Sequence, residues 1–194
     1  MVIKPSGLQY KKMKAADMVV LDLDANIIEG RLKPSSDAPT HLELYKNFPS
    51  MGGVAHTHSL HATAWAQAGR SIPVMGTTHA DHFYGDIPCT RKLNPAEVSR
   101  DYEINTGRAI VDAFRNTDAS SVPGVIVNDH GPFTWGKDPA EAVYNSIVLE
   151  EVAHMAILTH AIAGYDIIDN YLLDKHYRRK HGRDAYYGQE NEEN

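Results

Sequence analysis

The chain has almost no cysteine and no excess of positive charge, and both absences narrow its possible functions. Its 194 residues include one cysteine, Cys89, so no disulfide can form within the chain. That usage suits a reducing cytoplasm, where we expect the protein to be found. The formal net charge of −6 disfavours nucleic acid or an anionic membrane surface as the main partner.

Long apolar runs and nucleotide-binding loops are missing as well. The longest apolar stretch, residues 146–164, is interrupted by two glutamates and two histidines, so no membrane span is predicted. The N-terminus lacks the basic region and apolar run of a signal peptide, and no G-x-G-x-x-G loop is present for a dinucleotide cofactor. A hydrophobic content of 42% with 23% charged residues is typical of a soluble globular protein, and the length suits one domain, 1–194.

What remains is an alternation of strand and helix signals without internal repeats. β-branched apolar residues on both sides of Asn26 predict two short strands within residues 17–30. Caps and apolar runs predict the other elements: helices at 35–49, 60–69, 94–114, 138–164 and about 166–181, a strand at 51–58, and a strand at the start of 124–136 that a turn follows. This order predicts a compact α/β domain with helices packed on a central sheet.

Three histidines, His56, His58 and His61, lie within six positions of one another. Residues two apart on a strand face the same side, so His56 and His58 are expected to point together. Such a pair can bind a divalent transition metal through its imidazole nitrogens, although two polar residues on the solvent face of a strand would have the same spacing. His61 begins the next predicted helix and is expected to lie outside any metal site.

Other candidate ligands are scattered along the chain. His130 ends an apolar strand beside a Gly-Pro turn, and Asp37 stands at the start of a predicted helix. Taken alone, His130 would be interpreted as a histidine in a turn and Asp37 as a helix cap. Glu150 and His154, four residues apart on the longest predicted helix, are compatible with a ligand pair or with an ordinary side-chain pair on one helix face.

Several segments, in the same order, resemble the L-ribulose-5-phosphate 4-epimerases of the class II aldolase and adducin-like superfamily. They are IKPSG (3–7), KPSSDAPTH (33–41), GGVAHTHSLHATAWAQAG (52–69), GTTHADHFYGDIPCTR (76–91), NDHGPFTWGKDPAEAVYNSIVLEEVAHMA (128–156) and LLDKHYRRKHGRDAYYGQ (172–189). The resemblance implies a single-domain, three-layer α/β fold with a central, mainly antiparallel sheet flanked by helices. Family members also carry an N-terminal helix and a strand with a G-N motif, which this chain is expected to lack.

The resemblance also implies a metal site. Zn²⁺ would be bound by His56, His58 and His130, with Asp37 as a ligand or close neighbour, although imidazole-rich sites accept several divalent ions. In the aldolases of the superfamily a glutamate takes the place of Asp37. The shorter aspartate therefore favours the epimerase reaction.

That reaction converts L-ribulose 5-phosphate to D-xylulose 5-phosphate, in arabinose or ascorbate catabolism, by cleavage of C3–C4, rotation of the aldehyde and re-addition. It needs two acid/base groups on opposite faces of the aldehyde, and the resemblance assigns these roles to Asp81 and Tyr187. It also implies a homo-oligomer, expected to be a tetramer, in which the C-terminal segment reaches a neighbouring subunit's site. The residues implied to bind the sugar phosphate are Lys4, Ser6, Gly7, Ser35, Ser36, His176 and Arg179.

Other functions are weighed against this one. A class II sugar-phosphate aldolase would share the metal histidines. A metallo-β-lactamase-like hydrolase requires aspartate in its H-x-H-x-D-H motif where this chain has Leu60. A non-catalytic adducin-like interaction domain would keep the fold without the metal histidines, and an inactive, N-terminally truncated paralogue would keep the histidines without full activity.

Overall fold

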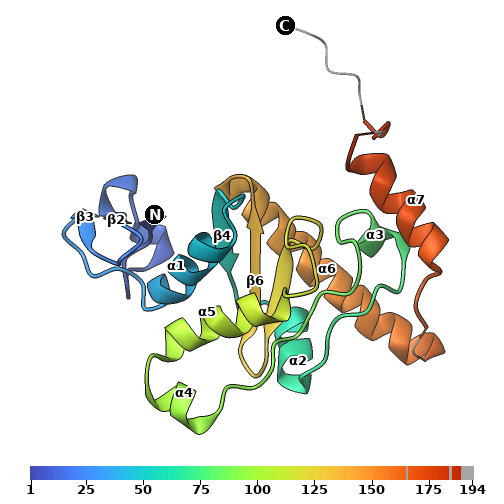
Figure 1. The fold of residues 1–194 in the computed structure, drawn as a ribbon, viewed down its shortest axis with the longest axis horizontal. Coiled ribbons are helices and arrows are strands. Elements are labelled where there is room, and N and C mark those ends of the chain that lie inside the picture. The colour runs from blue at the N-terminus through green and yellow to red at the C-terminus, as the bar shows by residue number, and fades with distance from the viewer. Residues whose placement is uncertain (165, 184, 189–194) are drawn as a thin grey trace, which may run out of the picture.

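A computed structural model describes residues 1–164, 166–183 and 185–188 of the chain, and its elements lie in an extended row of packed units (Figure 1). The strands are β1 (Val2–Ile3), β2 (Val19–Leu21), β3 (Ile27–Glu29), β4 (Gly53–His56), β5 (Gly124–Val127) and β6 (Gly131–Gly136). The α-helices are α1 (Ala38–Asn47), α2 (Leu60–Ala68), α3 (Thr77–Ala80), α4 (Pro95–Ser99), α5 (Tyr102–Ala113), α6 (Pro139–Ala163) and α7 (Asn170–Lys180). Two 3₁₀ turns, η1 (Tyr10–Lys12) and η2 (Ala15–Asp17), precede β2.

The strands form two antiparallel three-stranded sheets rather than one central sheet. The N-terminal sheet has the order β1-β2-β3, and the second sheet has the order β4-β6-β5. Figure 1 shows the N-terminal sheet at one end of the molecule and α7 at the other. The small core of the N-terminal sheet includes Ile3, Val19 and Leu21, with Ala38 from the start of α1. The mixed α/β class and the antiparallel pairing are confirmed.

The main core surrounds β6, the central strand of the second sheet. Residues 131–135 of this strand are all buried, and Phe133 is fully enclosed. Its ring stacks on His56 of β4 at a centroid distance of 4.0 Å, and the two residues are directly opposite in the ladder. Polar groups in this core are paired: Thr134 donates to the Ala142 carbonyl at 2.9 Å, and the Asn145 amide donates to the Trp135 carbonyl at 2.8 Å.

Helix α6 packs against α2 and against all three strands of this sheet. It begins at Pro139, where the side chain of Asp138 accepts a hydrogen bond from the Glu141 amide, as the sequence predicts. Among the described residues, α6 is the one helix that is long and apolar enough to cross a membrane by length and composition. That signal is weak, because core helices of soluble proteins meet the same criteria.

The helix predicted over 94–114 is wrong in one respect, because the structure divides it into α4 and α5. Arg100 is extended, and Asp101 adopts the left-handed conformation with φ +54°. The Asn105 side chain bridges the break by donating to the carbonyls of Glu97 at 3.1 Å and Arg100 at 2.8 Å. Neither glycine nor proline marks the break, so no local sequence signal predicts it.

Other boundaries also differ from prediction. The turn predicted after β5 is a hairpin turn, since residues 131–136 form β6. β4 ends at His56, so His58 lies in the loop after the strand rather than on it. The last helix begins at Asn170 rather than near residue 166, and the short α3, which the sequence did not predict, precedes Asp81.

The left-handed residue at the break between α4 and α5 generates a stability prediction. Asp101 is exposed and makes no side-chain cap, so its backbone conformation dominates the effect of substitution. Asp101→Val places a β-branched residue in the left-handed region and should lower the free energy of unfolding by about 1–3 kcal/mol. Asp101→Gly, the matched control, should change it by less than about 1 kcal/mol. Urea titration measures both, and equal effects of the two variants would contradict this account.

Candidate active site

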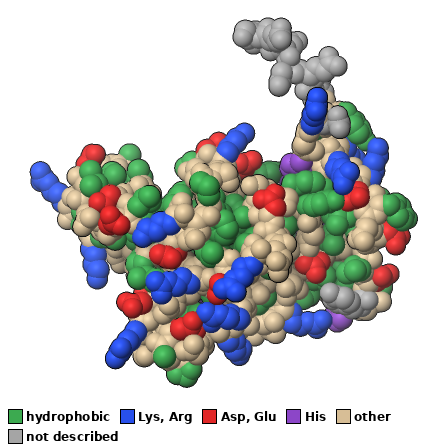
Figure 2. All heavy atoms as spheres, viewed as in Figure 1, with side chains coloured by type: hydrophobic (Ala, Val, Ile, Leu, Met, Phe, Trp, Pro, Cys, Tyr) green, Lys and Arg blue, Asp and Glu red, His purple; other side chains and the backbone are tan. Residues whose placement is uncertain are grey.

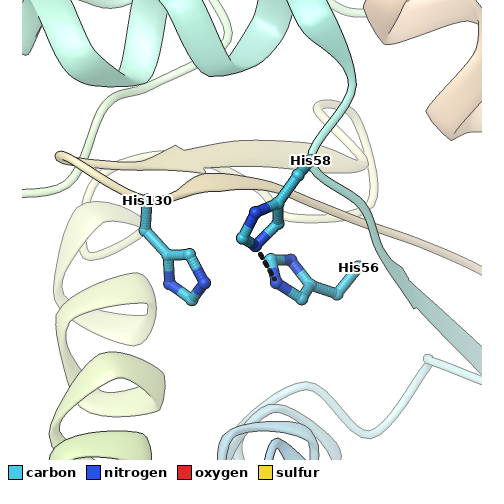
Figure 3. A group of neighbouring side chains, drawn as sticks. All are labelled: His56, His58 and His130. Carbon is cyan, nitrogen blue, oxygen red and sulfur yellow. Dashed lines mark hydrogen bonds between the residues drawn. The ribbon is translucent and has the colours of Figure 1, made fainter.

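Three histidines from two segments of the chain converge at one end of the second sheet. His56 ends β4, His58 follows it in the loop before α2, and His130 occupies the turn between β5 and β6. Figure 3 shows the three rings turned toward one another. One ligand atom from each lies within 4.8 Å of the others, and the Nε2 atoms of His56 and His58 are 3.2 Å apart.

That spacing fits a bound metal ion. Two nitrogens about 2.1 Å from one ion, at a tetrahedral angle, lie about 3.4 Å from each other. The loop is also shaped for close approach, because a Cβ at Gly131 would lie 2.8 Å from the Thr57 carbonyl oxygen and 3.4 Å from His58 Cδ2. Any larger residue at position 131 would therefore displace the segment that carries His58.

Hydrogen bonds and burial prepare His56 to act as a ligand. Its Nδ1 lies 2.9 Å from the Pro132 carbonyl oxygen, which can only accept, so Nδ1 carries the proton and Nε2 presents its lone pair. Burial lowers the pKa of His56 to about 4, and burial also lowers the pKa of His130, with a further decrease caused by the charge of His58. His56 and His130 are therefore neutral at pH 7, the state in which imidazole binds metal.

Asp37 stands beside these histidines but outside the group of three. It occupies the N-cap position of α1, yet its carboxylate makes no capping hydrogen bond. The interpretation of Asp37 as a simple helix cap is thus not supported. Its negative charge acts to raise the pKa of His56, of His130 and of His41, opposing the lowering by burial. The carboxylate is therefore close enough to the candidate metal site to act on it electrostatically.

His61 and the pair Glu150–His154 form a different arrangement. Glu150 accepts hydrogen bonds from the backbone amides of His61 at 2.9 Å and Ala62 at 3.0 Å, and its Oε1 lies 2.7 Å from His61 Nδ1. The His61 ring stacks on His154 at 3.9 Å. The glutamate of α6 therefore caps the start of α2, directly after the segment that carries His56 and His58.

Two similar segments bring together five of the residues expected to bind the sugar phosphate, whereas the other two, His176 and Arg179, lie on α7 beside Asp81. Lys4-Pro5-Ser6 pairs with Lys33-Pro34-Ser35 through an antiparallel bridge between Pro5 and Pro34. The Ser35 amide donates to the Lys4 carbonyl at 3.0 Å, and the Ser6 amide donates to the Lys33 carbonyl at 2.9 Å. Gly7 follows with φ +70°, and Ser36 leads into the start of α1. A helix N-terminus with serines beside it favours an anion.

The predicted acid/base residue Asp81 lies in a second cluster, between α3 and α7. Arg179 donates to both carboxylate oxygens, at 3.0 Å and 2.9 Å from Nη2, and His176 Nδ1 lies 3.0 Å from Oδ1. Lys180 Nζ is 3.1 Å from Oδ2. Burial alone would raise the pKa of Asp81, but the hydrogen bonds of these three basic residues outweigh that effect and lower it. Asp81 is therefore ionised at neutral pH.

Tyr187 belongs to the same cluster. Its backbone amide donates to the Arg179 carbonyl at 2.9 Å. The Arg179 guanidinium lies 5.0 Å from the centre of the Tyr187 ring, and Lys180 Nζ lies 4.7 Å from it. The side chain is otherwise largely exposed. Figure 2 shows lysine and arginine side chains grouped over this end of the molecule.

The two clusters are separate within one chain. Among the described residues, no hydrogen bond or ion pair joins Asp81 or Tyr187 to the three histidines. Figure 1 shows α7 at the right edge of the view and the hairpin turn between β5 and β6 below its centre. Gln189, the last residue of the matching C-terminal motif, lies outside the described residues.

Three residues near these clusters were not predicted. Lys180 contacts Asp81 and Tyr187, and its spacing from His176 along the helix could have revealed it. His41, whose pKa burial lowers to about 4, packs edge-on against Phe133 with ring centres 5.9 Å apart. The Tyr102 hydroxyl lies 3.4 Å from His130 Nδ1, a contact that depends on the unpredicted break before α5.

Comparison with known proteins places the chain in a family. The profile described as "Class II Aldolase and Adducin N-terminal domain" matches residues 1–157. The L-ribulose-5-phosphate 4-epimerase UlaF of Salmonella paratyphi A (strain ATCC 9150 / SARB42) is 57% identical over 189 residues, which cover 97% of this chain and 83% of that protein. The protein of the same name from Salmonella typhi matches to the same extent. The chain therefore belongs to the class II aldolase and adducin family.

Solved structures agree on the fold. An L-fuculose 1-phosphate aldolase superposes with a TM-score of 0.75 at 20% identity, covering 90% of this chain and 77% of that one. The L-fuculose 1-phosphate aldolase from Glaciozyma antarctica PI12 superposes with a TM-score of 0.74 at 20% identity, covering 94% of this chain and 68% of that one. At this identity the likeness concerns the fold alone.

The histidine geometry predicts where metal binds. His56→Ala should lower the affinity for a divalent transition metal by about two orders of magnitude, because it removes one of three converging nitrogens. His61→Ala removes a nearby histidine outside the group and should bind metal as the unmodified chain does. Metal content after dialysis and isothermal titration measure both. Equal losses in the two variants would contradict the assignment of the site.

Proposed function

We propose that this chain is a metal-dependent L-ribulose-5-phosphate 4-epimerase that converts L-ribulose 5-phosphate to D-xylulose 5-phosphate. The observation that carries the proposal is the 57% identity, over nearly the whole chain, to proteins of that name. The convergence of His56, His58 and His130, the pairing of the two Lys-Pro-Ser segments and the contacts of Arg179 with Asp81 further support it. Such an isomerase would act in pentose catabolism, in the cytoplasm, as the single unpaired cysteine suggests.

His56, His58 and His130 would hold the metal, with Asp37 as a further ligand or close neighbour. Three converging imidazoles suit zinc, and other divalent ions can bind such a donor set. When bound, the ion supplies Lewis-acid polarisation of the carbonyl oxygen of the ketose phosphate. The Pro132 carbonyl and the ring of Phe133 hold His56 in the orientation that this role needs.

The paired Lys-Pro-Ser segments would bind the phosphate end of the substrate. Ser6, Gly7, Ser35 and Ser36 offer hydroxyl and amide donors, and Lys4 adds positive charge. The charge of Lys4 also acts on His41, where it lowers the pKa together with burial, so Lys4 and Asp37 influence the same histidine. The phosphate site would thus adjoin the metal site across the first turn of α1.

Asp81 and Tyr187 would exchange the proton of the C4 hydroxyl on the two faces of the aldehyde. The proton leaves that hydroxyl as the C3–C4 bond breaks, and a proton returns to the new C4 oxygen when the bond re-forms. Arg179 and Lys180 contact both groups, and with His176 they provide the positive charge that a developing anion requires. Bond cleavage followed by re-addition inverts C4 without a redox step.

The reaction needs both clusters, although one chain holds them apart. The site is therefore complete only where the Asp81–Tyr187 cluster of one subunit meets the histidines of another, in a closed homo-oligomer that we take to be a tetramer. The outer face of α6 offers apolar surface for such assembly. Its exposed side chains are Val143, Tyr144, Ile147, Met155, Leu158 and Ile162.

Activity tests the function directly. With added zinc, the chain should convert L-ribulose 5-phosphate to D-xylulose 5-phosphate, and a chelator should abolish turnover until metal is restored. A second test uses the variant Asp37→Glu, which introduces the glutamate that the aldolases of the superfamily have at this position. We expect it to lower epimerase turnover by about tenfold or more by misplacing the carboxylate. Release of a free aldehyde without epimerisation by the unmodified chain would favour the aldolase alternative instead.

Mixing of inactive variants tests the shared site. His56→Ala and Asp81→Asn should each be inactive alone. When equal amounts are co-assembled at random, about a quarter of the sites combine the intact histidines of the Asp81→Asn chain with the intact aspartate of the His56→Ala chain, and activity should return to that extent. Asp81→Asn mixed with Tyr187→Phe is the control, because each site takes both groups from one chain and stays defective. Failure of the first pair to regain activity would overturn the shared site.

A further inference from the structure

We propose that Tyr102 is a positioning residue that fixes the orientation of His130 for metal binding. The inference rests on the proposed metal-dependent function. It extends that function to a residue that neither the sequence motifs nor the comparisons single out. The claim is that the Tyr102 hydroxyl accepts the Nδ1 proton of His130 and thereby directs the other nitrogen, Nε2, to the metal.

The Tyr102 hydroxyl approaches the ring nitrogen of His130 that this role requires. The Tyr102 oxygen lies 3.4 Å from His130 Nδ1, and the two ring centres are 6.3 Å apart at an angle of 35°. In Figure 3 one ring nitrogen of His130 faces the other two histidines, and the second faces away from them. A metal-binding histidine with a partner on its second nitrogen has its tautomer and ring orientation fixed.

His56 provides an internal comparison. Its Nδ1 is held by the Pro132 carbonyl, a backbone group that every residue at that position would supply. His130 has no such backbone partner among the described hydrogen bonds of its ring, and Tyr102 is the residue that approaches its Nδ1. The orientation of His130 therefore depends on a side chain, and a single substitution can remove it.

The local fold explains why a tyrosine reaches this point. Tyr102 is the first residue of α5 and directly follows Asp101, whose positive φ redirects the chain after α4. Its backbone carbonyl accepts from the Thr106 hydroxyl at 2.8 Å. The neighbouring Glu103 carbonyl accepts from the buried Thr40 hydroxyl of α1 at 2.7 Å. The unpredicted break and the attachment to α1 thus fix the start of α5 beside His130.

The test compares Tyr102→Phe with the unmodified chain. Removal of the hydroxyl alone should lower the affinity for Zn²⁺ by about tenfold or more. The thermal stability of the metal-free protein should stay unchanged. The control, Tyr144→Phe, removes an exposed hydroxyl on α6 and should leave Zn²⁺ affinity unchanged. Competition titration with a chromophoric chelator measures the affinities.

Two further measurements separate positioning from a general structural effect. In the zinc-loaded chain, long-range proton–nitrogen correlation spectra should show a protonated Nδ1 on His130, and Tyr102→Phe should accelerate the exchange of that proton. In a His130→Ala background, Tyr102→Phe should cause no additional loss of affinity, because its effect passes through His130.

The outcomes distinguish this inference from the proposed function. If His130→Ala weakens zinc binding but Tyr102→Phe does not, the positioning role is wrong and the metal site stands. An equal loss from Tyr102→Phe in the presence and absence of His130 likewise overturns the positioning role. If His130→Ala leaves zinc affinity unchanged, the metal site itself is wrong, and the proposed function fails with it.

Discussion

The antiparallel register of β4 against β6 is the constraint on which the candidate site depends. It places His56 opposite Phe133, so that a candidate metal ligand and a fully buried core residue are paired directly across the ladder. The same register brings His56 to the hairpin turn that carries His130, although many residues separate the two in sequence. A shift of one residue would turn His56 to the other face of the sheet and separate the histidines.

Two elements outside the sheet keep the loop around His58 in place. Gly131 allows the Thr57 carbonyl to approach the hairpin closely. Glu150 of α6 uses both of its carboxylate oxygens to hold the first amides of α2. The loop around His58 is thus held at two places. At Gly131 the lack of a side chain allows close backbone packing, and at the start of α2 the charged side chain of Glu150 binds the backbone amides. The Asp81 cluster depends instead on helices α3 and α7, which explains how the two clusters come to be separate.

Much of this arrangement could be predicted from the sequence. The candidate metal histidines, the two Lys-Pro-Ser motifs and the limits of α6 follow from spacing, caps and the family motifs, whereas the pairing of those two motifs through Pro5 and Pro34 was not predicted. The break at Asp101 could not, because Asp101 is an ordinary residue in a left-handed conformation that tertiary contacts impose. Tyr102 was missed for the same reason. His58 was expected on a strand, but the ladder ends at His56 and the loop geometry brings the ring back to its neighbour.

The bridge between Pro5 and Pro34 closes residues 6–33 into a loop. The paired segments at the base of this loop, residues 4–6 and 33–35, form the candidate phosphate site. Within that loop, the exposed η1 and η2 turns contribute no buried residue. The entropic cost of closing a flexible loop grows only with the logarithm of its length, about 0.6 kcal/mol for each doubling. Insertions in the η1–η2 stretch would therefore lower the free energy of unfolding only slightly. The Pro5–Pro34 bridge would still keep Ser6 beside Ser35. The region can vary in length without changing the geometry of the anion site.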